Sequence, residues 1–217
     1  MMAQTPSRQP TPRPATILAL TPARLAAAVV IFAAADWAYM GAGDSFFPGG
    51  ALDETAHFLT MLLILWALGD RFLVPRIAVP ALVATVVIDA DHIPGYLGYD
   101  FLTAGTPRPY THSLLTVAVV LAIASLWRRH RVSVLAAALG IAVHLWRDLS
   151  ESSGGVSIFA TPRPSVSLLW PWTTHAFSLP HASYLGVLAV VVAVCVGRCR
   201  RAPRVRAALP APAGREG

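Results

Sequence analysis

The sequence predicts an all-α membrane protein, a polytopic bundle of about six transmembrane helices, and two observations carry this prediction. The first is composition: 55% of the 217 residues are hydrophobic and only 13% are charged, whereas about one quarter of a soluble domain is charged. The second is charge placement, because all 17 basic residues are arginines in short clusters between apolar runs, which is typical of membrane proteins. We attribute the net charge of +6 to membrane topology and expect no nucleic-acid partner.

The chain divides into one helical domain and two polar tails. Residues 1–20 and 201–217 are rich in proline and arginine and lack an apolar period, so we expect both to be disordered cytoplasmic tails. The domain of residues 21–200 is expected to hold the transmembrane helices. Its six apolar segments, each close to the length that a bilayer requires, are 22–40, 54–74, 76–92, 112–127, 132–149 and 182–197.

Proline and threonine residues predict several helix ends. Thr21 is placed to cap the first helix, with Pro22 as its first residue. Pro94 is expected to end the third helix near Ile93. Thr111 is placed to cap the fourth helix.

The arginines also predict the orientation in the membrane. If the N-terminus is cytoplasmic, 14 of the 17 arginines lie on the inner side, a bias that agrees with the positive-inside rule. We therefore expect both termini in the cytoplasm of a bacterial inner membrane protein. A run of alanines at 33–35 could also serve as a signal-peptidase site, which would leave the remaining helices in the same orientation. The loops expected outside are 41–53, 93–111 and 150–181.

Most ionisable residues of the apolar segments fall at the outer helix ends, together with six of the seven histidines. Ionisable side chains at membrane depth are costly and by default functional. Four helices would bring to one membrane face the residues Asp53, Glu54, His57, Asp89, Asp91, His92, His112, His144 and Asp148.

The spacing of these residues favours a metal site. His144 and Asp148 are four residues apart and therefore share one helix face. Asp89 and His92 share a face as well, and an unwinding helix end would bring Asp91 towards them. Imidazoles and carboxylates without thiolates suit a divalent ion, with zinc expected first and manganese or iron as alternatives. The expected ligands are His57, Asp89, Asp91, His92, His112, His144 and Asp148.

These ligands outnumber what one zinc ion needs, so either two metals bind or some of the residues have other roles. Glu54 and Asp91 are the candidate catalytic groups, acting as a general base or from beside the ligands. Arg108 and Arg147 are expected to hold an anionic group of the substrate, such as a lipid phosphate.

Other polar residues have simpler interpretations. Asp36 lies beside two aromatic residues, as expected in an aromatic belt. His175 and His181 are expected at the interface and not as ligands. Cys195 and Cys199 are too few and too close for a disulfide framework or structural zinc, and we expect both to be inert.

Five short motifs resemble those of a bacterial family, the YdjM-like proteins, described as LexA-binding, inner-membrane-associated, metal-dependent hydrolases. The motifs occur in the family's order between residues 53 and 172. They are TAHF at 55–58, IDADH at 88–92, YTHSLL at 110–115, AVHLWRDL at 142–149 and SLLWPW at 167–172.

The resemblance implies a polytopic membrane protein with metal-ligand-like His and Asp residues, distantly similar to zinc-dependent phospholipase C and to single-strand nucleases. The sequence departs from the family motif HRGxTHS, because it has PRPYTHS at 107–113 and lacks the first histidine. No residue of the chain matches the LexA-binding part of the family's description.

The expected function is therefore hydrolysis of a phospholipid or phosphodiester by a metal site at the outer membrane face. A metal or proton transporter is a first alternative, which the confinement of the cluster to one face disfavours. A non-enzymatic membrane scaffold or regulator is the second. The loop 150–181 is too apolar for a solvated linker and is expected to dock over the site.

Overall fold

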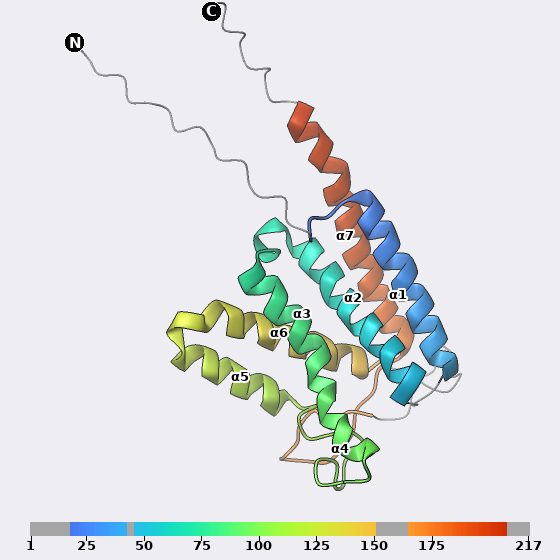
Figure 1. Cartoon of the computed structure of the whole chain (residues 1–217), viewed down its shortest axis with the longest axis vertical. Coiled ribbons are helices and arrows are strands. Elements are labelled where there is room, and N and C mark those ends of the chain that lie inside the picture. The colour runs from blue at the N-terminus through green and yellow to red at the C-terminus, as the bar shows by residue number, and fades with distance from the viewer. Residues whose placement is uncertain (1–17, 43–45, 151–164, 208–217) are drawn as a thin grey trace, which may run out of the picture.

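The computed structural model describes residues 18–42, 46–150 and 165–207, and it is all-helical over these ranges (Figure 1). Within them the only strand-like pairing is one isolated antiparallel bridge between Val166 and Phe177. A 3-10 turn at Ile88–His92 joins the third and fourth helices. The α-helices are α1 Pro22–Ala42, α2 Ala51–Leu68, α3 Pro75–Val87, α4 Ile93–Tyr96, α5 Leu114–Leu126, α6 Arg131–Asp148 and α7 His181–Ala207.

Among the described residues, four helical segments are long and apolar enough to cross a membrane, which is consistent with a membrane protein. They are Pro22–Gly41, Phe47–Leu68, Pro75–Tyr96 and His181–Arg201. The expected count of six is thus met in part. The other two expected segments form α5, a shorter apolar helix of 13 residues, and α6, which has 18 residues.

The expected tail 1–20 lies largely outside the described residues, as does 208–217. The last helix is longer than the apolar segment that predicts it, because α7 continues to Ala207. The helical part of the described chain therefore extends past the domain boundary expected at residue 200.

The helices form two groups in Figure 1. α1, α2 and α7 run side by side, whereas the hairpin of α5 and α6 lies across their direction. α3 packs mainly against α6 and also contacts α2, so it joins the two groups. α1 begins and α7 ends at one end of the molecule, while α4 lies at the opposite end.

The hydrophobic core surrounds α2, which contacts α1, α3, α6 and α7. Met61, Leu63 and Leu65 of this helix are fully buried, because α2 is apolar on several faces and has a neighbouring helix on each. Its Thr60 hydroxyl lies 2.5 Å from the hydroxyl of Tyr184 on α7. Polar side chains inside the bundle are thus paired across helices, as burial requires.

One of the three predicted helix ends is confirmed. Pro22 begins α1, and the backbone N–H of Arg24 donates to the Thr21 hydroxyl. The expectation for Pro94 is wrong, because α3 ends at Val87 and Pro94 lies in the first turn of α4, where its missing N–H costs nothing.

The expectation for Thr111 is also wrong. The residue before α5 is Ser113, and the Thr111 hydroxyl instead donates to the carboxylate of Asp91. A hydroxyl beside a carboxylate forms a stronger hydrogen bond than one at a helix end, so the interaction across the fold takes precedence over the local cap.

α3 and α6 approach closely at Gly140. A Cβ at this position would overlap the backbone carbonyl of Ala81 and lie 2.9 Å from the Thr85 hydroxyl. The absence of a side chain therefore sets the separation of the two helices. One turn further along both helices, His144 Nδ1 lies 2.8 Å from the carbonyl oxygen of Thr85.

We expect Gly140→Ala to destabilise the protein, because the added methyl group collides with backbone and not with a flexible side chain. Overpacking of this kind costs about 1–3 kcal/mol, which outweighs the gain of helix propensity of up to about 1 kcal/mol. Thermal unfolding in detergent measures the effect. Gly186→Ala in α7 is the matched control, since nothing lies within 4 Å of its Cβ position, and an equal response of the two variants would contradict the close approach.

Candidate metal centre

Four side-chain atoms from three segments converge on one point inside the bundle: His112 Nε2, His144 Nε2, Asp89 Oδ1 and Asp148 Oδ2. His112 Nε2 lies 2.9 Å from Asp89 Oδ1, 3.2 Å from His144 Nε2 and 3.5 Å from Asp148 Oδ2. His144 Nε2 lies 3.1 Å from Asp89 Oδ1 and 3.2 Å from Asp148 Oδ2. These atoms define the central site.

The five distances, 2.9–3.5 Å, are close to the spacing of ligands around a small cation, and four of them are slightly shorter. Zinc binds imidazole nitrogen and carboxylate oxygen at about 2.0–2.2 Å in tetrahedral geometry, which places neighbouring ligand atoms about 3.3–3.6 Å apart. Two imidazole nitrogens facing each other at 3.2 Å need either a proton or a cation between them. The donor set of the central site therefore fits a divalent metal ion.

The two central histidines are oriented by their second ring nitrogens. His144 Nδ1 lies 2.8 Å from the Thr85 carbonyl oxygen, which can only accept a hydrogen bond, so the hydrogen is on Nδ1 and Nε2 is left with a free lone pair. His112 Nδ1 lies 3.2 Å from Asp91 Oδ2. A carbonyl or carboxylate at the far nitrogen is the usual partner of a metal-binding histidine.

The 3-10 turn Ile88–His92 explains how one short segment supplies several of these groups. An uninterrupted helix would keep Asp91 away from Asp89 and His92. The tighter turn instead brings Asp89 and Asp91 to opposite nitrogens of the His112 ring. The expectation that an unwinding helix end returns Asp91 to the site is therefore confirmed.

His92 lies on the more open side of the site. Its side chain is 26% exposed, and its Nε2 lies 3.7 Å from Asp89 Oδ1 and 3.9 Å from Asp91 Oδ1. Together with His112, these residues form a group of four potential metal-binding side chains. Solvent reaches the cluster from this side.

His57 lies on the opposite, α2 side and is fully buried. Its ring stacks on that of His144, with the ring centroids 3.8 Å apart. Its Nε2 lies 3.2 Å from Asp148 Oδ1 and 3.5 Å from Asp53 Oδ1. The predicted convergence of the histidines and carboxylates is thus present in the structure, and their role as ligands stays a prediction.

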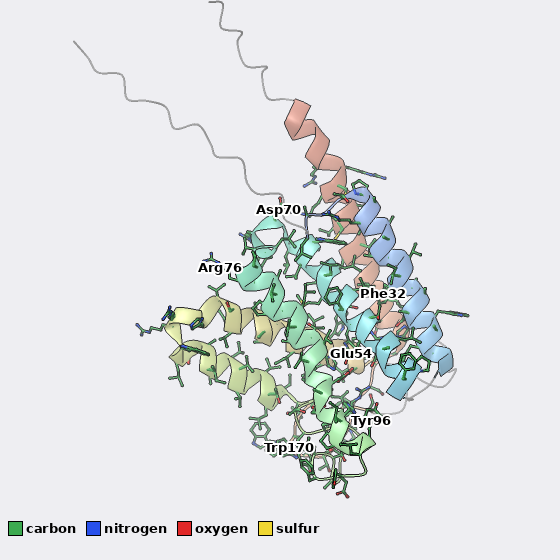
Figure 2. The ribbon with its side chains drawn as sticks, viewed as in Figure 1. Phe32, Glu54, Asp70, Arg76, Tyr96 and Trp170 are labelled. Atoms are coloured by element: carbon green, nitrogen blue, oxygen red, sulfur yellow. The ribbon has the colours of Figure 1, made fainter. Side chains whose placement is uncertain are left out.

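Glu54 lies in the first turn of α2 (Figure 2). Its carboxyl group lies beside that of Asp89, and its Oε2 is buried without a hydrogen-bond partner. Two neighbouring carboxyl groups repel each other unless a proton or a cation lies between them. The position of Glu54 therefore suits a group that takes up a proton beside the central site.

The interior of the site attracts positive charge. Burial lowers the pKa of His112, but Asp89 and Asp91 outweigh the burial and raise this pKa above its ordinary value. Burial also opposes the charge of Arg108, whose pKa is nevertheless raised by Asp148. Arg108 Nη1 donates to Asp148 Oδ2 at a distance of 3.2 Å, so this predicted substrate-binding arginine lies at the edge of the cluster.

Arg147, the second predicted substrate-binding residue, lies in a buried network that the sequence did not reveal. Its guanidinium group is 2% exposed and donates to Asp53 and to Asp36. His181 completes the network, with Nε2 placed 2.9 Å from Asp36 Oδ2 and Nδ1 placed 2.8 Å from the Ser150 carbonyl oxygen. We refer to Asp36, Asp53, Arg147 and His181 as the anchoring network.

The anchoring network bears on the expectations for Asp36 and His181. Their side chains are 5% and 2% exposed, so both lie inside the protein and not on its surface. The rule applied to the outer helix ends, that ionisable residues in apolar segments need a partner, applies equally to Asp36 and could have identified it. Arg147 is held between two carboxylates, and its role in substrate binding stays a prediction.

The remaining histidines and cysteines lie away from the centre. His130 and His175 are exposed, as is typical of surface or interfacial residues. Cys195 is buried against α2, with its Sγ 3.5 Å from the Leu63 carbonyl oxygen, and Cys199 is half-buried.

The described part of the last loop, residues 165–180, docks on the helices that carry the site. The Ser165 hydroxyl donates to the Asp148 carbonyl oxygen at 3.2 Å. The rings of Tyr110 and Trp170 stack with their centroids 4.5 Å apart. This part of the loop is therefore packed against the site segments.

Several apolar residues of that loop were expected to dock as well. Leu168 packs against the cluster formed by Ile141 and Leu145 of α6, whereas Trp172 is 76% exposed. Ile158 and Phe159 lie outside the described residues.

In comparisons with known proteins, no family model, no curated protein and no solved structure matches this chain. The resemblance to the YdjM-like family therefore remains a prediction from the five motifs. What the fold and the site define together is an all-helical chain with potential metal-binding His and Asp groups and four candidate membrane-spanning helices.

We expect His181→Ala to destabilise the protein, because it removes a partner of the buried Asp36 carboxylate. The loss of one partner of a buried charged group costs about 1–3 kcal/mol. Thermal unfolding in detergent measures the effect, with His130→Ala, which alters an exposed histidine, as the control. Identical unfolding temperatures of the two variants would show that the anchoring network does not hold the helices together.

Proposed function

We propose that this protein is a membrane-bound, metal-dependent hydrolase with a divalent cation, zinc first, in the central site. The supporting observation is the set of four converging ligand atoms, in which His112 Nε2 and His144 Nε2 each lie 2.9–3.5 Å from the other three. Hydrogen bonding alone accounts poorly for this set, because two imidazole nitrogens and two carboxylate oxygens compete for the same point. A bound cation at such a site polarises a phosphoryl or carbonyl oxygen and makes water acidic enough to react near neutral pH.

The residues around the central site have distinct roles in this proposal. Glu54 Oε2, which is buried and unpartnered, accepts the proton of the attacking water. Asp91 orients His112 through Nδ1, from which it lies 3.2 Å away, and it is the alternative base. Arg108 reaches the cluster from the segment before α5 and holds an anionic group of the substrate.

A phospholipid or another phosphodiester is the proposed substrate class. A metal ion and an arginine beside the site favour a phosphate group, and the candidate membrane-spanning helices support a lipid as its source. The resemblance to the YdjM-like family, with its inner-membrane hydrolases, agrees with this proposal. The proposed location is the inner membrane of a bacterium.

The proposed topology has both termini in the cytoplasm and the site on the extracytoplasmic side, with α5 and α6 as a further pair of spans. The arginine bias supports it. We expect single cysteines introduced into the segment 97–106 to react with a membrane-impermeant maleimide in intact cells, and cysteines introduced at 128–130 to react only after lysis. Reaction of 97–106 only after lysis would reverse the sidedness of the site.

Metal content and turnover test the proposal together. We expect His144→Ala and Asp148→Ala to lose metal and all turnover of a phospholipid and phosphodiester panel, because each removes one of four converging ligands. Glu54→Gln should keep its metal and lose turnover by roughly 10²-fold or more, as expected for a general base. Elemental analysis of the purified protein measures the metal.

His130→Ala is the control for these variants, because it alters an exposed histidine in the turn before α6, whereas His144 and Asp148 lie at the other end of that helix. Unchanged metal content in folded His144→Ala and Asp148→Ala would favour the scaffold alternative, in which the cluster only joins helices. Metal binding with transport into vesicles and without turnover would favour the transporter alternative.

A further inference from the structure

A fully buried imidazole beside the central site lacks the hydrogen bonds that burial requires. Neither ring nitrogen of His57 has a hydrogen-bond partner, although the side chain is completely buried. An unsatisfied buried polar group costs about 1–3 kcal/mol, and such groups in a native structure need an explanation. The stacking of His57 on His144 accounts for the ring faces and not for the nitrogens.

His57 Nε2 and the carboxylate oxygens near it are arranged as the ligands of one cation would be. Asp148 Oδ1 lies 3.2 Å away, yet neither atom has a hydrogen-bond partner. Asp53 Oδ1 lies 3.5 Å away. Separations of 3.2 and 3.5 Å are close to the spacing between two ligands of one cation.

The Asp148 carboxylate lies between His57 Nε2 and the central site. Its Oδ2 faces His112 and His144, at 3.5 and 3.2 Å, while its Oδ1 faces His57. A carboxylate that directs each oxygen to a different set of imidazoles is suited to bridge two cations. Asp89 also belongs to a group with Asp53 and His57 whose ligand atoms lie within 4.8 Å of one another.

Charge balance favours a second cation independently. Six carboxylates lie in the cluster and the anchoring network, those of Asp36, Asp53, Glu54, Asp89, Asp91 and Asp148, and among the described residues two arginines pair with them, Arg108 and Arg147. With neutral imidazoles, as metal ligation requires, four negative charges remain, two more than a single divalent cation neutralises. Two cations would neutralise all four.

We propose that a second divalent cation binds on the α2 side of the first, between His57 Nε2, Asp148 Oδ1 and Asp53, and that Asp148 bridges the two ions. This proposal rests on the proposed function, because it takes the central site as the place of the first ion. Paired cations at shared carboxylates lie about 3.5–4 Å apart.

The first test is the number of Mn²⁺ or Zn²⁺ ions bound by the full-length protein in detergent after removal and readdition of metal. We expect two ions per chain in the wild type and one in His57→Gln, which keeps a polar side chain of similar size. His175→Gln is the matched control, an exposed histidine, and is expected to keep both ions.

The possible results separate this inference from the proposed function. One ion in the wild type would overturn the second site and leave the metal-dependent hydrolase in place, whereas no ion would overturn both. Two ions in His57→Gln, with one lost in His92→Gln, would move the second ion to the open side and overturn its assignment to α2.

A second measurement needs no variant and therefore does not depend on the folding of His57→Gln. Two Mn²⁺ ions that share a carboxylate couple magnetically, so we expect the electron paramagnetic resonance spectrum of the fully loaded wild type to show an exchange-coupled pair. The half-loaded protein should show less of this signal. A spectrum of isolated Mn²⁺ at full loading would exclude a bridge through Asp148.

Discussion

The carboxylates of Asp53, Asp89 and Asp148 lie inside an apolar helical bundle, and the free energy of burying them constrains the rest of the structure. An unpaired carboxylate away from water costs several kcal/mol at least, so each must face a positive or hydrogen-bonding group. These partners come from different helices, and satisfying them fixes how α2, α3 and α6 meet. The same contacts therefore form the candidate site and hold the helices of the bundle together.

Two adjacent residues at the end of α6, Arg147 and Asp148, connect the anchoring network with the central site. Arg147 faces Asp36 and Asp53 in the anchoring network, while Asp148 faces the imidazoles of the central site. Asp53 then contacts His57 at 3.5 Å, so the network reaches the cluster on the α2 side as well. A change at Asp36 or His181 would therefore shift the imidazoles, although neither residue belongs to the central site.

The sequence predicted the helical class and the convergence of the charged residues, because apolar segments and their polar ends follow from periodicity and placement alone. It could not predict the 3-10 turn at Ile88–His92 or the separate role of Thr111, since both arise from contacts with His112 and Asp91 across the fold. The close approach at Gly140 was equally hidden, because a glycine in an apolar segment has no local signature. The number of membrane-spanning helices depends on the orientation of α5 and α6, which hydrophobicity alone does not determine.

All basic residues of the chain are arginines, and the pairing of buried carboxylates explains why arginine suits the interior better than lysine. A guanidinium group presents several N–H donors in one plane, so Arg147 serves two carboxylates from different helices while 2% exposed, which a lysine ammonium would do with less fixed geometry. Lysine would also lose its charge more readily when buried, leaving Asp36 and Asp53 uncompensated. Arginine keeps its charge in the interior, so Arg147 pairs ionically with Asp36 of α1 and Asp53 of α2 and holds both helices against α6.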